Sequence, residues 1–544
     1  VNVNTEEIYQ TNFSIKNGII TYVGKENKGV KEKDLNGKFV CPGFIDAHVH
    51  IESSLVNLTR FAEAVIPRGT TSVVADPHEI ANVLGIEGIK MVMDESKSLP
   101  LRFFFTIPPC CPATKLGTSG CAVSLTDIRK ALFWENVVGL AEVMDYHGVL
   151  KKDKLLLSKI KCARGRIIDG HAPGLRGEEL NEYILAGMSS DHECIRYREG
   201  VEKIRLGMKV LLCEGSTKKI DKFVRLLNLY PSGNFMFATD DKQINEIISN
   251  GHMDFALRKA IKLGADPIKV IKMSTLNTAK HYGIERLGFI APGKLADFLI
   301  IKDIDKLDIE EVYINGKCVA KNGKILVKFK PPKYPKNVLN SVHLNLIKKN
   351  MIKIESKKDK INVIKVREGY LTTTKRIAKA KVENGFLSSD IEKDILKACV
   401  IERHRKTGEI GIGFVSGFGL KRGAIGTTYA HDCHNIVALG TNDNDIVYAV
   451  NILIKAQGGM VVVENKKTKA LLKLPIAGLM SNLSIPKVLD KIEKLKEATK
   501  ELGCKMREPF ATLSFLSLEV LPKIRLTNKG LVDVDKLKII GLVV

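Results

Sequence analysis

Histidine is scarce in this chain, and its positions suggest chemistry. Only 12 of the 544 residues are histidine. Five of them follow short apolar or β-branched runs within the first two hundred residues: His48, His50, His78, His171 and His192. Carboxylates follow similar runs, at Asp76, Glu142 and Asp240. Neutral imidazoles bind borderline divalent cations, carboxylates can tie two cations together, and a water between them becomes a hydroxide near neutral pH.

Six of these residues make up the set that a two-metal hydrolytic site requires: His48, His50, Glu142, His171, His192 and Asp240. A lone histidine is usually a core or surface residue, but six such residues at the ends of apolar runs make coincidence a poor explanation. His48 and His50 are two residues apart, so both side chains point to the same face of a strand. We expect that face to be the interior of the fold.

To bring these side chains together, the chain needs strands whose ends meet. Eight runs are predicted strands: 43–50, 70–76, 101–107, 137–143, 165–171, 187–192, 209–214 and 235–240. Helical patterns with apolar residues three and four apart lie between them, as in 80–96 and 124–135. These alternations predict an α/β fold, a (β/α)8 barrel whose active site lies at the C-terminal ends of the strands.

The segments around the barrel are predicted to form further units. We assign residues 43–288 to the barrel. Residues 1–42 and 289–327 carry short alternating runs, each too small for a core of its own, and are expected to pair into one composite β-sandwich domain. The proline-rich stretch 328–337 is a predicted linker, and residues 338–544 are predicted to form a separate C-terminal α+β domain.

Composition and charge exclude several classes of protein. The 85 Lys+Arg against 61 Asp+Glu give a net charge of +24, but the lysines are dispersed, without the Arg clusters or aromatic interleaving that grip nucleic acid. No apolar run approaches the ~18 residues that cross a bilayer, so no membrane partner is expected. The first residues contain no secretory signal, and the 11 cysteines form no CxxC pair. A cytoplasmic protein with reduced thiols is therefore expected.

Several motifs resemble the amidohydrolase superfamily, and more specifically its adenine deaminase family. The superfamily resemblance lies in PGFIDAHVH (42–50), MSTLNTAKHYG (273–283) and GKLADF (293–298). The run of motifs that resembles the adenine deaminase family comprises FIDAHVHIESS (44–54), ADPHEIANVLG (75–85), LAEVMD (140–145), DGHAPGL (169–175), SSDHE (189–193) and TDD (239–241). AHDCHN (430–435) and LTNKGLVDV (526–534) extend the resemblance over nearly the whole chain.

The resemblance implies a reaction: hydrolysis of adenine to hypoxanthine and ammonia in purine salvage, by attack of a metal-bridging hydroxide on C6. Its metals are expected to be manganese or iron, with zinc as a further option, and a homodimer is the expected assembly. By motif position, His48, His50 and Asp240 would hold one ion and His171 and His192 the other, with Glu142 bridging both. The sequence leaves open whether Asp240 or Asp241 is the last ligand. Another amidohydrolase, such as a cyclic amidase or a deacetylase, is the alternative, although cyclic-amide hydrolases commonly carry a carboxylated lysine where this chain has Glu142.

Proton transfer requires further groups. Asp240 is expected to take a proton from the hydroxide and pass it to the amine, while Glu79 protonates the ring with Asp76 orienting it. The alternative for Glu79 is a carboxylate at a helix start. His78 is a third metal ligand, a substrate contact or a structural residue. His431 and His434, the only clustered histidines beyond the barrel, either serve the structure, chelate a metal, or close over the substrate as part of a lid.

Overall fold

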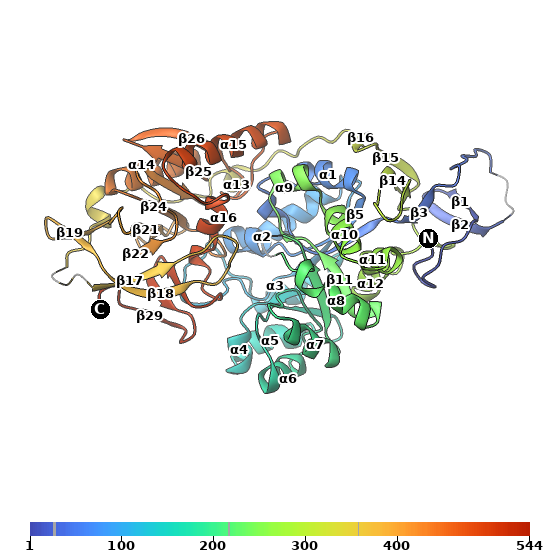
Figure 1. Ribbon diagram of the computed structural model, residues 1–544, viewed down its shortest axis with the longest axis horizontal. Helices are drawn as coiled ribbons and strands as arrows, with labels where there is room; N and C mark the ends of the chain where they lie inside the picture. The colour runs from blue at the N-terminus through green and yellow to red at the C-terminus, as the bar shows by residue number, and fades with distance from the viewer. Residues whose placement is uncertain (26–28, 216–217, 357, 359) are drawn as a thin grey trace.

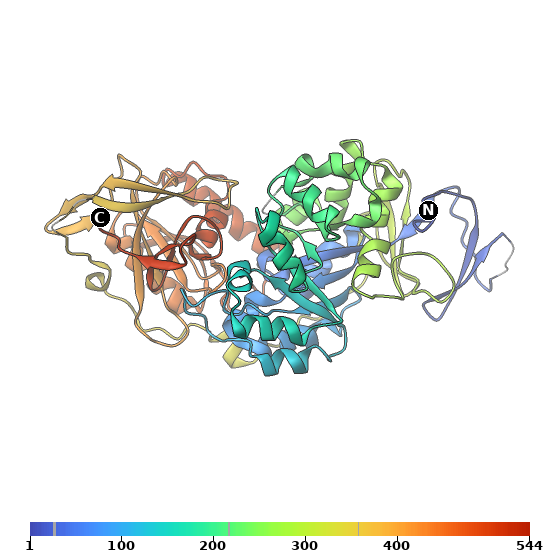
Figure 2. The same cartoon turned by 90° about the horizontal axis from the view of Figure 1, so that it is seen from below.

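The computed structural model describes residues 1–25, 29–215, 218–356, 358 and 360–544. Three parts lie along its long axis (Figure 1). The blue-to-green barrel occupies the middle, with the first hairpin at one end of the molecule and the yellow-to-red C-terminal part at the other. The view from below keeps the same order (Figure 2). Within the described residues, none of the helices combines the length and apolar character that crossing a membrane requires.

The barrel is built from parallel strands. Their bounds are β4 (Phe44–His50), β5 (Thr70–Ala75), β6 (Arg102–Ile107), β7 (Val137–Val143), β8 (Ile167–Gly170), β9 (Ser190–Asp191), β10 (Lys209–Cys213), β11 (Phe235–Ala238) and β12 (Asp240–Asp241). They pair in the orders β12-β4-β5-β6-β7-β8 and β11-β10-β9. All eight predicted strand regions are present, which confirms the α/β barrel. The last region is split in two, because Asp240 has a left-handed backbone with φ of 57°.

Helices connect the strands and follow the last of them. They are α1 (Leu58–Val65), α2 (His78–Ser96), α3 (Leu125–Ala131), α4 (Tyr146–Leu150), α5 (Lys154–Cys162), α6 (Gly177–Leu185), α7 (Tyr197–Arg205), α8 (Ile220–Leu229), α9 (Ile244–Asn250), α10 (Met253–Lys262), α11 (Pro267–Met273) and α12 (Leu276–His281). Capping residues in the sequence explain where several of these helices begin. Asn57 caps α1, Ser124 and Asp127 form a capping box on α3, and Asp266 caps α11 ahead of Pro267.

Segments before and after the barrel pair with each other. Strands β1 (Asn12–Lys16) and β2 (Ile19–Gly24) form a hairpin around Asn17 and Gly18, whose φ angles are 52° and 77°. Strand β3 (Phe39–Pro42) pairs with β13 (Phe298–Ile301) at the edge of a sheet that continues through β14 (Ile309–Ile314), β15 (Lys317–Lys321) and β16 (Lys324–Ile325). The domain boundaries proposed above remain predictions.

The C-terminal part contains an eight-stranded sheet in the order β18-β17-β22-β21-β24-β23-β25-β26. Its strands are β17 (Lys360–Lys365), β18 (Thr374–Lys379), β21 (Leu396–Ile401), β22 (Ile410–Ser416), β23 (Ala424–Thr427), β24 (Ile436–Gly440), β25 (Gly459–Glu464) and β26 (Lys467–Lys473). Smaller sheets pair β19 (Lys381–Glu383) with β20 (Phe386–Ser388), and β27 (Ile524–Thr527) with β28 (Gly530–Asp533) and β29 (Lys538–Ile540). The helices are α13 (Lys336–Leu339), α14 (Asp443–Ala456), α15 (Ile485–Glu501) and α16 (Pro509–Ser514).

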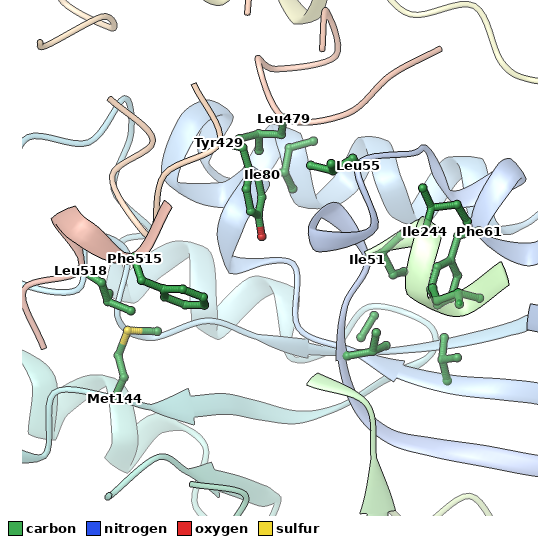
Figure 3. Packing of buried hydrophobic residues seen from close by; sticks show 14 of the residues in the cluster. Ile51, Leu55, Phe61, Ile80, Met144, Ile244, Tyr429, Leu479, Phe515 and Leu518 are labelled. Atoms are coloured by element: carbon green, nitrogen blue, oxygen red, sulfur yellow. The ribbon is translucent and has the colours of Figure 1, made fainter. Parts of the chain in front are cut away.

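One hydrophobic core crosses from the barrel into the C-terminal part. Leu55 and Ile80 of the barrel belong to the same buried cluster as Tyr429, Leu479 and Phe515 (Figure 3). Backbone contacts reinforce it, because the Ser481 amide donates to the Leu55 carbonyl at 2.8 Å. Burial of apolar surface stabilises by roughly 25 cal/mol per Å². The C-terminal part is therefore held firmly against the barrel, on the side where α2 begins.

Candidate active site

Five strand ends bring the six predicted metal ligands into one cluster. His48 and His50 end β4, and their Nε2 atoms lie 3.0 Å apart. Nε2 of His50 also lies 3.3 Å from Oε1 of Glu142, on β7, and 3.3 Å from Oδ1 of Asp240, on β12. Nε2 of His48 lies 3.9 Å from each of the same two oxygens. These four side chains form one half of the cluster.

The second oxygen of Glu142 faces the other half. Nδ1 of His171, just after β8, lies 2.5 Å from Oε2 of Glu142, and Nε2 of His192, just after β9, lies 3.3 Å from it. The ring of His192 stacks on that of His48 at a centroid distance of 4.2 Å. Glu142 thus stands between two sets of histidines, with one oxygen toward each.

The residues of this cluster fit divalent metal ions. Among the described residues, Nε2 of His171 is buried without a hydrogen-bond partner, and the contact of its Nδ1 with Oε2 of Glu142 is close but lacks hydrogen-bond geometry. Burial alone would raise the pKa of Glu142, but His171 and His192 hold it well below its usual range. Burial and the neighbouring His192 and His50 hold the pKa of His48 well below its usual value, in the neutral form that binds metals. Burial opposes the charged forms of His50 and His192, but Asp240 and Glu142 raise the pKa of His50 well above its usual value and that of His192 to about 9. A cation bound here takes the place of those protons.

A second group forms around Glu79, in the first turn of α2. Its Oε1 lies 3.1 Å from Nε2 of His431, and its Oε2 faces Nε2 of His434. Nε2 of His78 lies 3.6 Å from Oε1 of Glu79, while Nδ1 of His78 lies 3.6 Å from Oε1 of Glu142. His78 therefore connects this group with the metal-ligand cluster.

Asp76 contacts His78, whereas the sequence predicts that it orients Glu79. Its Oδ1 accepts a hydrogen bond from the His78 amide at 3.1 Å, and its Oδ2 lies 3.2 Å from Nδ1 of His78. Burial opposes the charged form of His78, but Asp76 and Glu79 raise its pKa well above the usual value. The contacts of Asp76 are therefore with His78, and the imidazole of His78 lies between Asp76 and Glu79.

Sequence reasoning missed several neighbours of Glu79. Oδ1 of Asp432 lies 3.8 Å from Nε2 of His78. The Tyr429 hydroxyl lies 3.1 Å from Nε2 of His431 and 2.6 Å from the Ser53 hydroxyl. Asp241 lies 3.5 Å from Nε2 of His431, so the two adjacent aspartates face different groups. Asp432, Asp241 and Ser53 lie within motifs noted in the sequence, AHDCHN, TDD and FIDAHVHIESS, whereas Tyr429 lies in none of them.

An apolar wall closes the space above the metal-ligand cluster. Met144 comes from the barrel, while Leu371, Phe515, Leu518, Val520 and Leu521 come from the C-terminal part. Figure 3 shows Met144 opposite Phe515 and Leu518. The cavity between this wall and the cluster measures about 30 Å³, which is room for about one water molecule. A larger cavity of about 570 Å³ lies between α2 and residues 332–338 and includes none of the predicted ligands.

Comparisons with known proteins identify the family of the chain. The model of the amidohydrolase family matches residues 39–319, and that of the adenine deaminase C-terminal domain matches residues 370–538. An adenine deaminase of Dehalococcoides mccartyi is 42% identical over 544 residues, covering 99% of this chain and 95% of that protein. The chain belongs to the adenine deaminase family. An adenine deaminase of Archaeoglobus fulgidus is 42% identical over 543 residues, covering 100% of this chain and 94% of that protein.

Membership of the adenine deaminase family makes the chain an amidohydrolase-type hydrolase, and it confirms the resemblance read from the motifs. It leaves the cyclic amidase and deacetylase alternative without support. A solved structure described as an adenine deaminase aligns with a TM-score of 0.45 at 18% identity, covering 57% of this chain and 96% of that one. A β-aspartyl dipeptidase from Fervidobacterium islandicum aligns with the same TM-score and identity, over 60% of this chain and 96% of that one. Family membership and the donor set together indicate a divalent metal site.

Proposed function

We propose that the protein hydrolyses adenine to hypoxanthine and ammonia at a centre of two divalent ions, manganese or iron. The observation that carries the proposal is the position of Glu142, which turns one oxygen to His48 and His50 and the other to His171 and His192. Adenine is proposed as the substrate because adenine deaminases 42% identical to this chain match it over nearly its full length.

The ligands divide between two positions. His48, His50 and Asp240 would hold one ion and His171 and His192 the other, with Glu142 shared. When bound, the ions lower the pKa of the attacking water and stabilise the charge that develops on its oxygen. The chain's own task is to hold these donors in overlapping groups that share Glu142 and His48, and to keep His48 neutral.

The reaction moves two protons from water. In the products the water oxygen is on C6, one proton has joined a ring nitrogen, and the other has joined the amine. Oδ1 of Asp240 lies 3.3 Å from Nε2 of His50 within the metal-ligand cluster. From there Asp240 can accept one proton of the attacking water and deliver it to the leaving amine.

The ring proton comes from the group around Glu79. His431, His434 and His78 hold the pKa of Glu79 well below its usual range against the effect of burial, so this carboxylate is ionised at rest. His78 carries the proton, because Asp76 and Glu79 raise its pKa. Glu79, 3.6 Å from Nε2 of His78, relays that proton to the ring, and the second proton of the water then restores the proton of His78.

The C-terminal part closes the site as a lid. Phe515 stacks on His431 with ring centroids 4.1 Å apart, and both face the cavity. A cavity of about 30 Å³ cannot hold a purine ring. Substrate entry therefore requires Phe515 and its neighbours to move away from Met144, and their return excludes water during the reaction.

The proposal is tested by metal analysis of the purified protein together with ammonia release from adenine. About two ions per chain and adenine-dependent ammonia are expected, with dihydroorotate as a cyclic-amide control that should not turn over. If the protein hydrolysed dihydroorotate and did not deaminate adenine, the proposed adenine deaminase function would be wrong. We further propose that the protein is a homodimer, which analytical ultracentrifugation would test. We also propose a cytoplasmic location, because the eleven cysteines are free thiols.

A further inference from the structure

Lys203, on α7, is a fully buried lysine beside the second half of the metal-ligand cluster. Its side chain is 0% exposed. Its Nζ donates to three oxygens, at 2.6 Å to Oδ2 of Asp191, 2.7 Å to Oε1 of Glu199 and 2.8 Å to the carbonyl of Ala172. Asp191 and Glu199 are also fully buried. All three donor positions of the ammonium are thus used inside the protein.

Each acceptor is tied to a loop that carries a histidine. Asp191 precedes His192, and its Oδ1 accepts from the amide of Ala172, the residue after His171, at 3.0 Å. The Ala172 carbonyl accepts from Lys203 itself. Lys203 and Asp191 together therefore hold the residues next to both histidines in one hydrogen-bonded unit.

Glu199 extends this unit along both loops. Its Oε1 accepts from the amide of Gly174, beyond His171, at 2.9 Å. Its Oε2 accepts from the amides of Ile195 and Arg196, beyond His192, at 2.9 and 3.2 Å. The loop after β8 and the loop after β9 are thus bound to the same pair of carboxylates, which Lys203 neutralises.

The other half of the cluster has separate support. Asp46, within β4, accepts from the amide of Thr239 at 3.0 Å, and Asp240 pairs with Val49 of β4. These contacts join β4 to the strand end that carries Asp240, and so hold His48, His50 and Asp240 together. The two halves share Glu142 but rest on different buried networks.

We propose that Lys203 is a positioning residue for one half of the metal centre. It fixes His171 and His192 as a pair, so the chain without it keeps the ion held by His48, His50 and Asp240 and loses the other. Loss of the ammonium leaves Asp191 and Glu199 as unpaired buried carboxylates, which repel each other and admit water between the loops. The inference rests on the proposed two-metal function.

The test is Lys203→Met in the full-length protein, with metal content measured after dialysis against metal-free buffer. The expected change is from about two ions per chain to about one. Lys397→Met is the matched control, because Lys397 is 1% exposed and donates to Asp443 at 2.7 Å in the C-terminal part. It also loses a buried ion pair, yet it should keep both ions.

Glu199→Gln decides the question if Lys203→Met does not fold. This variant retains Lys203 and the shape of the side chain but weakens the hold on both loops, and the affinity for one of the two ions should fall by about 10- to 100-fold. Wild-type affinity for both ions, equal weakening of both, or loss of an ion from Lys397→Met would each overturn the inference. A wild-type protein that binds fewer than two ions would instead overturn the proposed function.

Discussion

Nε2 of His431, in the C-terminal part, lies 3.1 Å from Oε1 of Glu79, at the start of α2 in the barrel. The same nitrogen lies 3.5 Å from Asp241 and 3.1 Å from the Tyr429 hydroxyl. A histidine more than 350 residues away along the chain thus completes the surroundings of a barrel carboxylate. The C-terminal part supplies side chains to the site and does more than cover it.

Glu142→Gln should remove metal and activity together. A glutamine presents one oxygen and one NH₂ group, and the NH₂ would face histidine nitrogens that need a cation. Metal analysis and ammonia release from adenine check this expectation. Glu95→Gln is the matched control, because Glu95 is a buried carboxylate that accepts from Thr59 and Tyr334 far from the cluster. Full metal content and turnover in Glu142→Gln would show that the bridging assignment is wrong.

Glu79→Gln should keep the metals and lower turnover by about 10²- to 10⁴-fold, the usual contribution of a positioned proton donor. Its oxygens face histidines of the second group and not the unpaired donors of the cluster. The effect should appear in kcat with metal content unchanged. A near wild-type rate would return Glu79 to the role of a helix-start carboxylate, and loss of metal would place it among the ligands.

His434→Ala tests the contribution of the C-terminal part. His434 is fully buried, with Nδ1 accepting from the Ala430 amide and Nε2 facing Glu79. We expect kcat to fall at least about tenfold with both metals retained, because a partner of the relay is lost. His343→Ala, which changes an exposed histidine of the same part, should have no effect. An unchanged rate in His434→Ala would confine this part to stability.

Point variants are preferable to truncation at residue 336 for this question. Leu55 and Ile80 share their buried cluster with Tyr429, Leu479 and Phe515. Removing the C-terminal part would expose that apolar surface on the barrel, and the exposed surface would favour aggregation. A truncated protein without activity would then not separate a missing lid from a damaged barrel.

The sequence predicts those site residues whose positions are set by secondary structure. A histidine or carboxylate after a β-branched run marks a strand end, and parallel strands bring their ends together, so His48, Glu142 and His192 could be grouped from the sequence. The contacts of Tyr429 and Ser53 depend on how one folded unit packs on another, 376 residues apart. No local pattern encodes such packing.

The break between β11 and β12 has a related cause. Asp240 takes a left-handed φ of 57°, which a run of apolar residues ending in Thr-Asp-Asp does not reveal. Its neighbour Asp241 hydrogen-bonds with Ser53 and approaches His431. The separation of the two aspartates between two groups follows from the fold, and the sequence alone left it open.

Glu519 provides a prediction about pH and stability. It is 0% exposed, its Oε1 accepts from the Thr114 hydroxyl at 3.1 Å, and its Oε2 has no hydrogen-bond partner among the described residues. Burial raises the pKa of Glu519 from its usual 4.5 to about 7. The folded protein therefore binds more protons than the unfolded chain between these two values, and its stability falls as the pH rises from about 4.5 to about 7.

Glu519→Gln should remove this pH dependence, since glutamine stays neutral while keeping the shape of the side chain. At pH 5 the wild type and the variant should unfold at similar temperatures, because Glu519 is then protonated in the folded wild type. At pH 8 the variant should be more stable, by up to about 3 kcal/mol for a shift of 2.5 units. Thermal unfolding at pH 5, 6, 7 and 8 measures the difference. A difference of the same size at every pH would mean that packing of the new side chain, and not ionisation of Glu519, sets the change in stability.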